Sequence, residues 1–486
     1  MTKSNNFFYK SVRVAAACAI AISTLFSPVE ARVRNFASAK DVQSLKFLSA
    51  NHMPVKVLVV YSPNQKNQNF VITLMNIVAD MHDKGLVKQE DAFKVHVIPG
   101  WEMQEADYAF IREKVGAERV KKYVEFNNVY TTTDMWMQDW GEVGVVKLKS
   151  EKKPQTVVFD SNRGRDNAEL PGILASFWNS YLLKNPSTHF SGGDYGGNIE
   201  VTPDNILLIG NTSTPELRGF LEKNGYKNRM AVLETDWLHV GHVDEYISVC
   251  PNAKAARGYT LIKANPRLAL RLIKDSSLAD LRAIPLKDYR DAMIEVRKYL
   301  LKAEVNRAAQ KKRKNNEALP EDQKFGVAVL NYLELSETTS ESGMELATGH
   351  MVRGSEVEEF IKLNLTLANL IDANLKKACE KISEVRKEKE GKLHSIISFP
   401  ALFRAMYGGK HIAYIPGSVN QLILNNQLIV PDPKIEIMRK YIARTLGKMG
   451  LQANFVDSLP YHNLQGQIHC GTNVFRHPNK YFVKPR

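Results

Sequence analysis

Four short stretches of the chain gather reactive and polar residue types among apolar neighbours. In chain order they read TTDMWMQDWGEVG (132–144), FSGGDYGGNIEV (190–201), TDWLHVGHVDEYI (235–247) and GQIHCGTN (466–473). The last stretch holds Cys470, and a cysteine thiolate attacks an electrophilic carbon when an acid–base partner is near. On the cysteine alone, a buried structural thiol, half of a disulfide, a metal ligand and a catalytic nucleophile are all open.

The third stretch offers acid–base partners for that cysteine. His242 and Asp244 are separated by one residue, so on a strand both side chains would point to the same face. Such a pair could polarise a proton transfer, bind a metal or have a purely structural role. The spacing does not match the HExxH pattern of zinc proteases. A metalloprotease is therefore a weak interpretation of this stretch.

A cysteine with a histidine elsewhere in the chain also fits a Cys–His protease. That class of enzyme does not explain why so many carboxylates lie in these stretches. Acidic side chains in apolar, tryptophan-bearing segments favour a pocket for a cationic group rich in hydrogen-bond donors, such as a guanidinium.

The elements around these stretches follow an α/β pattern. Runs rich in β-branched residues predict strands at 55–61, 93–98, 156–159, 205–209, 230–233, 246–249, 259–262, 395–399, 412–416, 422–430 and 453–456. Helix-length segments at 70–84 and 168–183 lie between some of them. The chemistry-bearing stretches fall between these elements, so we expect them to lie in the connections.

Residues 278–390 have a different texture, rich in Leu, Ala, Lys and Glu. From Ser355, a plausible N-cap, to Gly391, a plausible stop, apolar residues recur at helical spacing and are interrupted by Asn364. We interpret the region as an antiparallel helical pair inserted into the α/β body, and as a scaffold without chemistry.

The first 31 residues have the pattern of an export signal. Lys3, Lys10 and Arg13 precede an uncharged stretch at 14–26, and small residues precede a cleavage site after Ala31. The stretch is too short to span a bilayer, although an N-terminal anchor is the alternative. We expect a mature protein that is secreted or periplasmic, with no membrane span.

Charge and cysteine content narrow the function further. The formal net charge is +14, which makes acidic partners possible, but no nucleic-acid motif accompanies it. Cys18 would leave with the signal, so Cys250, Cys379 and Cys470 remain. An odd number excludes a disulfide framework, and Cys379, beside an apolar helix face, is interpreted as an inert thiol.

Five motifs in order resemble the catalytic domain of the peptidylarginine deiminases. They are MWMQDWGEVG, FDSNRGR, YGGNIEV, TDWLHVGHVDEYISVCP and GQIHCGTNV, and IPGSVNQLILNNQLIVPDP resembles the segment before that family's active-site cysteine. The resemblance covers about 52–266 and 393–480 and matches the helical region only loosely. It makes 32–486 one deiminase catalytic domain with 278–390 as an insertion within it.

The resemblance implies a pentein-type fold, an α/β-propeller of five ββαβ-like modules around a central pocket. It also implies hydrolysis of the arginine guanidinium to citrulline and ammonia through a thiouronium on cysteine. By motif position, Cys470 would be the nucleophile and His242 the general acid and base. Asp139 and Asp244 would hold the guanidinium nitrogens.

The resemblance implies two further substrate contacts. Arg165 would bind the backbone carbonyl of the substrate, and Trp136 would wall the aliphatic stem of its arginine. The structural alternatives are a surface arginine in a polar loop and a core tryptophan.

Calcium is a further implication, because the animal enzymes of this family need it. The residues that match one family site are Gln138, Glu142, Gly196, Ile199 and Glu200, with Gly196 and Ile199 contributing backbone carbonyls. These are oxygen ligands, which calcium prefers. A neighbouring family site has Trp140 and Gly164 where ligands would be expected, so a calcium-independent enzyme is also open.

The sequence therefore predicts an exported hydrolase, a protein-arginine deiminase acting on arginine in a peptide or protein. A deiminase of free arginine or agmatine, or an amidinotransferase, is the alternative from the same fold class. Arg165, with no obvious second arginine to bind a free carboxylate, favours a peptide substrate. An inactive exported binding protein is the alternative from another class.

Overall fold

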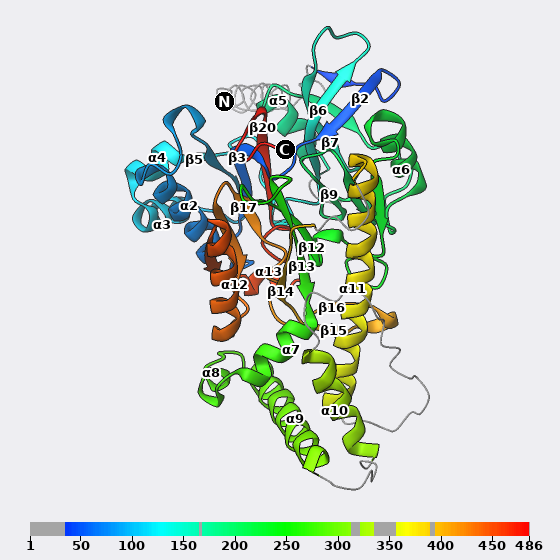
Figure 1. Cartoon of the computed structure of the whole chain (residues 1–486). Coiled ribbons are helices and arrows are strands. Elements are labelled where there is room, and N and C mark those ends of the chain that lie inside the picture. The colour runs from blue at the N-terminus through cyan, green and yellow to red at the C-terminus, as the bar shows by residue number, and fades with distance from the viewer. Residues whose placement is uncertain (1–34, 165–167, 313–320, 335–355, 389–393, 486) are drawn as a thin grey trace, which may run out of the picture.

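The computed structural model describes residues 35–164, 168–312, 321–334, 356–388 and 394–485. The predicted signal at 1–31 and Arg165 lie outside these ranges. Within them the strands form six sheets, with helices on their outer sides (Figure 1). The predicted α/β class is confirmed.

One connectivity recurs in five of these sheets: an antiparallel pair of strands, a helical crossover and a third strand parallel to the second. Parallel neighbours need such a crossover, which is usually a helix. The first two units are β6 (Gly141–Leu148), β7 (Gln155–Asp160), α5 (Leu170–Phe177) and β8 (Tyr181–Lys184), and then β9 (Ile199–Val201), β10 (Leu207–Gly210), α6 (Pro215–Leu221) and β11 (Met230–Leu233).

The next two units follow the same order. They are β12 (Ile247–Pro251), β13 (Tyr259–Asn265), a helical region and β14 (Ile396–Pro400), and then β17 (Leu422–Leu424), β18 (Gln427–Pro431), α12 (Glu436–Met449) and β19 (Gln452–Val456). A hairpin of β15 (Phe403–Ala405) and β16 (His411–Ala413) stands between them, with η7 (Tyr407–Gly409) at its tip.

The fifth unit takes strands from both ends of the described chain. β20 (Thr472–Tyr481) pairs antiparallel with β3 (His52–Tyr61), and α2 (Gln68–Asp83) leads from β3 to the parallel β4 (Lys94–Pro99). Further elements are β1 (Phe36–Ala37), β2 (Val42–Phe47), η2 (Gln89–Asp91), α3 (Glu105–Val115), α4 (Ala117–Tyr123), β5 (Val124–Phe126), η3 (Gly192–Asp194), η4 (Gly196–Asn198), η5 (Glu222–Tyr226) and α13 (Leu459–His462). The five units have the predicted ββαβ order, while their closure into a propeller stays a prediction.

Two predicted elements were wrong in detail, each at an asparagine in the left-handed region. The predicted helix at 168–183 ends at Phe177, and the chain then turns through Asn179 (φ 48°) into β8. The predicted strand at 422–430 is a hairpin of β17 and β18, because Asn425 (φ 57°) turns the chain between them. Asparagine tolerates this backbone region better than most residues, so it ends regular structure at low cost.

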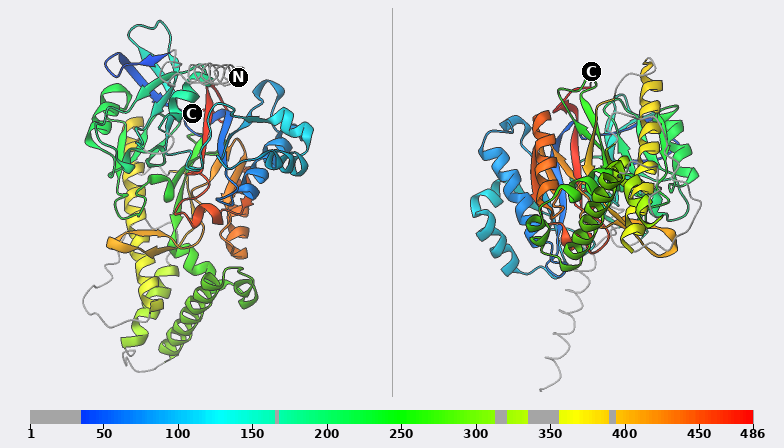
Figure 2. Two further views of the ribbon diagram at one scale, coloured as in Figure 1. Left: turned by 180° about the vertical axis from the view of Figure 1, so that it is seen from behind. Right: turned by 60° about the horizontal axis from the view of Figure 1, so that its bottom comes forward.

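The helical region lies between β13 and β14 and begins earlier than residue 278. Its helices are α7 (Pro266–Asp275), α8 (Leu278–Arg282), α9 (Lys287–Lys312), α10 (Glu321–Glu334) and α11 (Glu356–Arg386). Asn265 caps α7 by accepting the Leu268 N–H, and Pro266 occupies the first turn, where its missing N–H costs nothing. In Figures 1 and 2, α9 and α10 extend away from the sheets while α11 runs back along them.

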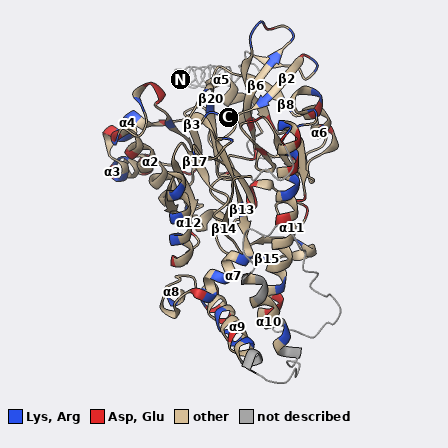
Figure 3. Ribbon diagram, viewed as in Figure 1, with Lys and Arg blue, Asp and Glu red and all other residues tan. Residues whose placement is uncertain are grey.

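The apolar face predicted for α11 packs inward, and Asn364 on that face has a structural partner. Its side chain accepts the Phe403 N–H and donates to the Phe403 carbonyl, so it anchors β15 to the helix. Acidic and basic residues alternate along the outer surfaces of α9 and α11 (Figure 3). None of the helices in the described ranges has the length and apolar character that a membrane crossing requires.

Candidate active site

The predicted catalytic residues lie in three connections that precede strands. Asp139 is in the turn before β6, His242 and Asp244 flank the start of η6 (Val243–Glu245) before β12, and Cys470 is in the turn before β20. The prediction that His242 and Asp244 share one face of a strand was wrong, because η6 is a 3-10 turn. They nevertheless face one point: a Cβ added to Gly197 would lie 2.6 Å from His242 Nδ1 and 3.2 Å from Asp244 Oδ2.

The sulfur of Cys470 lies between a carboxylate and an amide. Sγ is 3.6 Å from Asp244 Oδ2, and Asn420 Nδ2 donates to Sγ at 3.2 Å. Burial raises the pKa of the Cys470 thiol well above its ordinary value, and the nearby Asp244 and Asp139 raise it further. The sulfur is therefore a protonated thiol before any cation enters the site.

Asp244 has one engaged and one free carboxylate oxygen. Oδ2 lies 2.8 Å from His469 Nδ1, while Oδ1 is buried and has no hydrogen-bond partner within the described part of the chain. Burial alone would lower the pKa of His469, but its hydrogen bond with Asp244 and that carboxylate's charge raise it. A buried acceptor without a partner is costly, so Oδ1 is poised to receive a donor from a ligand.

His242 has the complementary arrangement on its ring. Nε2 lies 2.9 Å from the Gly192 carbonyl, so this nitrogen carries the hydrogen and donates it. Nδ1 then has a free lone pair, and it is buried with no partner among the described residues. The backbone N–H of His242 donates to Glu245, whose pKa burial raises to about 8. Nδ1 can thus take up or release a proton inside the site.

Asp139 is held by an arginine that the sequence analysis passed over. Arg163 Nη2 lies 3.3 Å from Asp139 Oδ2, and Nη1 lies 2.8 Å from Asp134 Oδ2. Arg163 is only 3% exposed. The segment FDSNRGR also holds Arg165, whose predicted contact with a substrate carbonyl stays a prediction. Sequence reasoning gave no role to Arg163, because its ion-pair partners Asp134 and Asp139 lie in another motif.

Trp136 lies against the segment that carries the cysteine. A Cβ added to Gly466 would be 2.2 Å from Trp136 Cζ3, so only glycine allows this close approach. The indole also lies edge-on to the Tyr461 ring, with 5.9 Å between centroids. Trp136 is thus packed against the segment that carries Cys470, and its contact with an arginine stem stays a prediction.

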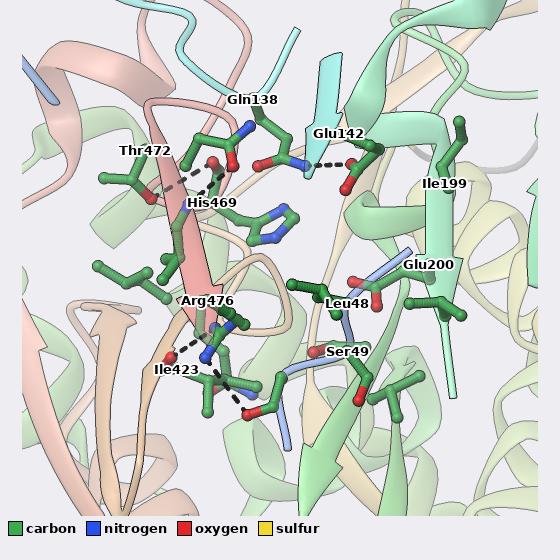
Figure 4. Close-up of a pocket in the computed structure, with 18 residues that line it drawn as sticks. Leu48, Ser49, Gln138, Glu142, Ile199, Glu200, Ile423, His469, Thr472 and Arg476 are labelled. Carbon is green, nitrogen blue, oxygen red and sulfur yellow. Dashed lines mark hydrogen bonds between the residues drawn. The ribbon is translucent and has the colours of Figure 1, made fainter. Parts of the chain in front are cut away.

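Four of the five predicted calcium ligands, Gln138, Glu142, Ile199 and Glu200, line a cavity of about 70 Å³ that lies beside the cysteine-bearing segment. Figure 4 shows Glu142 and Glu200 on the side of β6 and β9, with Arg476 on the opposite side. Gln138 Nε2 donates to Glu142 Oε1 at 2.7 Å. Burial and mutual repulsion raise the pKa of Glu142 well above its ordinary value, and burial raises that of Glu200 to about 7.

The donor chemistry of this cavity fits a hard cation. A Cβ on Gly196 would lie 2.3 Å from the Gln138 carbonyl and 2.9 Å from Glu142 Oε1, so oxygens converge there. Gln421 also lines the cavity, and both of its amide atoms are buried with no hydrogen-bond partner among the described residues. No group of three or more His, Cys, Asp or Glu side chains arranged for a metal occurs in the described ranges. The predicted set has two carboxylates and otherwise amide and carbonyl oxygens, so that finding does not bear on it.

Two further site residues, Asn420 and His469, were not predicted. Asn420 lies inside a motif that the sequence analysis quoted, and His469 directly precedes Cys470. For His469, its place next to the candidate nucleophile was the sequence signal that could have identified it as a site residue. The other two thiols in the described ranges, Cys250 and Cys379, are also free and buried. Burial raises the pKa of both, as expected of inert thiols.

Comparison with known proteins gives one family. The model of the protein-arginine deiminase (PAD) family matches residues 47–482. The type-3 protein-arginine deiminase of Rattus norvegicus is 28% identical over 380 residues, which are 71% of this chain and 47% of the relative. The type-4 enzyme of Homo sapiens is 28% identical over 375 residues, with the same coverage. The chain spans about half the length of the curated relatives it matches.

Solved structures were also compared. An agmatine deiminase from C. jejuni aligns over 89% of this chain and 96% of its own, with 13% identity and a TM-score of 0.44. At that score the superposition carries no argument about function.

Proposed function

Because the chain belongs to the protein-arginine deiminase family, we propose that it hydrolyses the guanidinium of arginine in a peptide or protein to citrulline and ammonia. One observation carries the proposal. The sulfur of Cys470 lies 3.6 Å from Asp244 Oδ2, while Asp244 Oδ1 and His242 Nδ1 are buried without partners in the described chain. In one buried place the sulfur would supply an electron pair, the Asp244 oxygen would accept hydrogen bonds from a cation, and the His242 nitrogen would accept a proton.

Binding would place the guanidinium between Asp139 and Asp244. Two carboxylates can make charge-assisted hydrogen bonds to its nitrogens, and they would hold its carbon against the sulfur. Trp136 would cover the aliphatic stem. The bound cation would also neutralise the two charges that raise the pKa of the Cys470 thiol. The thiol would therefore lose its proton when substrate binds, and His242 Nδ1 would receive it.

The first half of the reaction forms a bond between Sγ and the guanidinium carbon. The resulting tetrahedral adduct takes the proton from His242 on one nitrogen, which leaves as ammonia, and a thiouronium remains on Cys470. In the second half His242 takes a proton from water, and the oxygen attacks the same carbon. The adduct then loses its hydroxyl proton to solvent as the carbon–sulfur bond breaks, which releases citrulline, and the thiolate takes back a proton from His242.

Calcium at the neighbouring cavity is part of the proposal. Gln138, Glu142 and Glu200, with the carbonyls of Gly196 and Ile199, would hold the ion. Its charge would offset the repulsion between Glu142 and Glu200 and would order the turn that carries Cys470, since the Gln138 N–H donates to the Cys470 carbonyl at 3.0 Å.

The test of the activity is citrulline release from a blocked arginyl amide, a protein, free arginine and agmatine. The amide and the protein should turn over, and Cys470→Ser should abolish release while its circular dichroism spectrum stays that of the wild type. Cys250→Ser, which removes another buried thiol, should retain activity. Turnover of free arginine or agmatine alone would reject a peptide substrate, and full activity of Cys470→Ser would reject the nucleophile.

Calorimetry tests the cation site separately. The wild-type protein should bind Ca²⁺, and Glu200→Gln should weaken binding at least about tenfold, because a carboxylate ligand is lost. Glu216→Gln, at an exposed position of α6, should bind as the wild type does. Absence of binding to the wild type would reject calcium and leave the proposed reaction intact.

A further inference from the structure

Asn420 is a buried amide whose hydrogen-bonding capacity is entirely spent on the nucleophile and its surroundings. It lies in the turn before β17 and is 2% exposed. Its Oδ1 accepts the backbone N–H groups of His469 at 3.0 Å and Cys470 at 3.2 Å. Its Nδ2 donates to Cys470 Sγ at 3.2 Å and to the Asp244 carbonyl at 3.3 Å.

These contacts leave one orientation for the amide. If oxygen and nitrogen were exchanged, the NH₂ group would face two backbone N–H donors, and the oxygen would face the Asp244 carbonyl. Both changes bring like groups together in a buried place, where lost hydrogen bonds are costly. Asn420 therefore presents an N–H to the sulfur, and this direction is enforced by the backbone on three sides.

In this hydrogen bond the N–H of Asn420 is the donor and the sulfur of Cys470 is the acceptor. It leaves the S–H hydrogen to point elsewhere, and the remaining neighbour in range is Asp244 Oδ2 at 3.6 Å. When the thiol loses its proton, the same N–H meets a full negative charge and the hydrogen bond strengthens. The donor is already in place, so no reorganisation is needed at that moment.

We propose that Asn420 holds Cys470 in its attacking position and stabilises negative charge on its sulfur through the N–H···S hydrogen bond. The inference rests on the proposed role of Cys470 as nucleophile. It adds a group that serves twice in the reaction, because the sulfur carries negative charge before attack and again when it leaves the carbon.

Asn420→Asp is the deciding variant, because it keeps the acceptor oxygen that both backbone N–H groups use and removes the N–H donor to the sulfur. We expect alkylation of Cys470 by iodoacetamide, followed by mass spectrometry of its peptide, to slow about 10- to 100-fold at a fixed pH. The kcat for citrulline release should fall by a similar factor, with KM changed less than about threefold, since the sulfur does not bind the substrate. Asn420→Ala should act in the same direction.

Asn364→Ala is the matched control. Asn364 is also a buried asparagine that clamps backbone groups, in its case those of Phe403, but it does not touch the sulfur. Its loss should lower the thermal midpoint and leave the alkylation rate of Cys470 unchanged. Should folded Asn420→Asp be alkylated at the wild-type rate, the inference is overturned. A wild type that is alkylated faster than Asn420→Asp but releases no citrulline would support the inference and reject the proposed reaction.

Discussion

At the residue scale, the site depends on atoms that are buried without partners. Asp244 Oδ1 and His242 Nδ1 each lack a partner in the described chain, while the other atom of each group is engaged, by His469 and by Gly192. The engaged atoms fix the orientation of each side chain, and the unpartnered atoms are the ones that face the bound group. Such an arrangement lowers the stability of the free protein. The lost stability would be regained when a cation with several hydrogen-bond donors binds.

Gly197→Ala tests this arrangement. The added methyl group would lie 2.6 Å from His242 Nδ1 and 3.2 Å from Asp244 Oδ2, so both side chains would have to shift. We expect kcat/KM for an arginyl amide to fall by about 100-fold or more, because displacements of about 1 Å have effects of that size. Gly219→Ala is the control, since no atom lies within 4 Å of its added methyl group. Equal activity of the two variants would contradict the geometry of the site.

At the element scale, the helical insertion is tied to the cysteine-bearing end of the chain. Tyr289 in α9 shares a hydrogen bond of 2.7 Å with His462 Nε2 in α13. His462 Nδ1 accepts from Gln467 Nε2 at 2.6 Å, three residues before Cys470. The neutral imidazole with its hydrogen on Nε2 satisfies both contacts. A second proton, on Nδ1, would face the Gln467 amide hydrogens. The insertion therefore contacts the segment that leads to Cys470 and is more than a remote extension.

This contact predicts sensitivity to acid. Burial lowers the pKa of His462 to about 4, below the value of about 6.5 in an unfolded chain. The unfolded state therefore takes up the proton first, and stability present above pH 6.5 is lost as the pH falls toward 4. This histidine alone accounts for about 3 kcal/mol of that loss. In urea unfolding at pH 7 and 4.5, His462→Gln should lose less stability on acidification than the wild type.

His189→Gln is the control for that measurement, since His189 is exposed. It should show the wild-type dependence on pH. If His462→Gln also showed the full loss between the two pH values, the buried ring would not be the source of the sensitivity.

At the scale of the whole molecule, the chain closes on itself. Cys470, the proposed nucleophile, lies in the turn before β20, and β20 completes the sheet that begins with β3 near the start of the described chain. Asn51 reinforces this closure from a fully buried position, because its Nδ2 donates to the carbonyls of Gly258 and Val483, each at 2.9 Å. One amide thus joins three segments that are far apart in the sequence.

Asn51→Ala should therefore destabilise the protein as a whole. Two buried carbonyls would lose their donor, which costs about 2 kcal/mol in the free energy of unfolding. Asn69→Ala, at an exposed position of α2, should change it by less than about 0.5 kcal/mol. Chemical denaturation followed by fluorescence measures both. The same loss in the two variants would mean that the closure does not depend on this amide.

Much of the fold could be predicted because its determinants are local. β-branched runs specified most strands, and helical spacing specified α11 with its inward face. Prediction was wrong where one asparagine changed the backbone direction, at Asn179 and Asn425. It was also wrong for His242 and Asp244, because residues Val243–Glu245 form a 3-10 turn where alternation suggested a strand.

The sequence by itself determined which residue types could do the chemistry, and in which order they occur along the chain. Only the tertiary structure decided which of their atoms remain available. That Arg163 is the arginine held against Asp139, and that Asn420 donates to the sulfur, depends on contacts between segments separated by tens of residues. Hydrogen bonds are short and directional, so their partners are chosen by the packing of whole sheets, and spacing along the chain does not encode that packing.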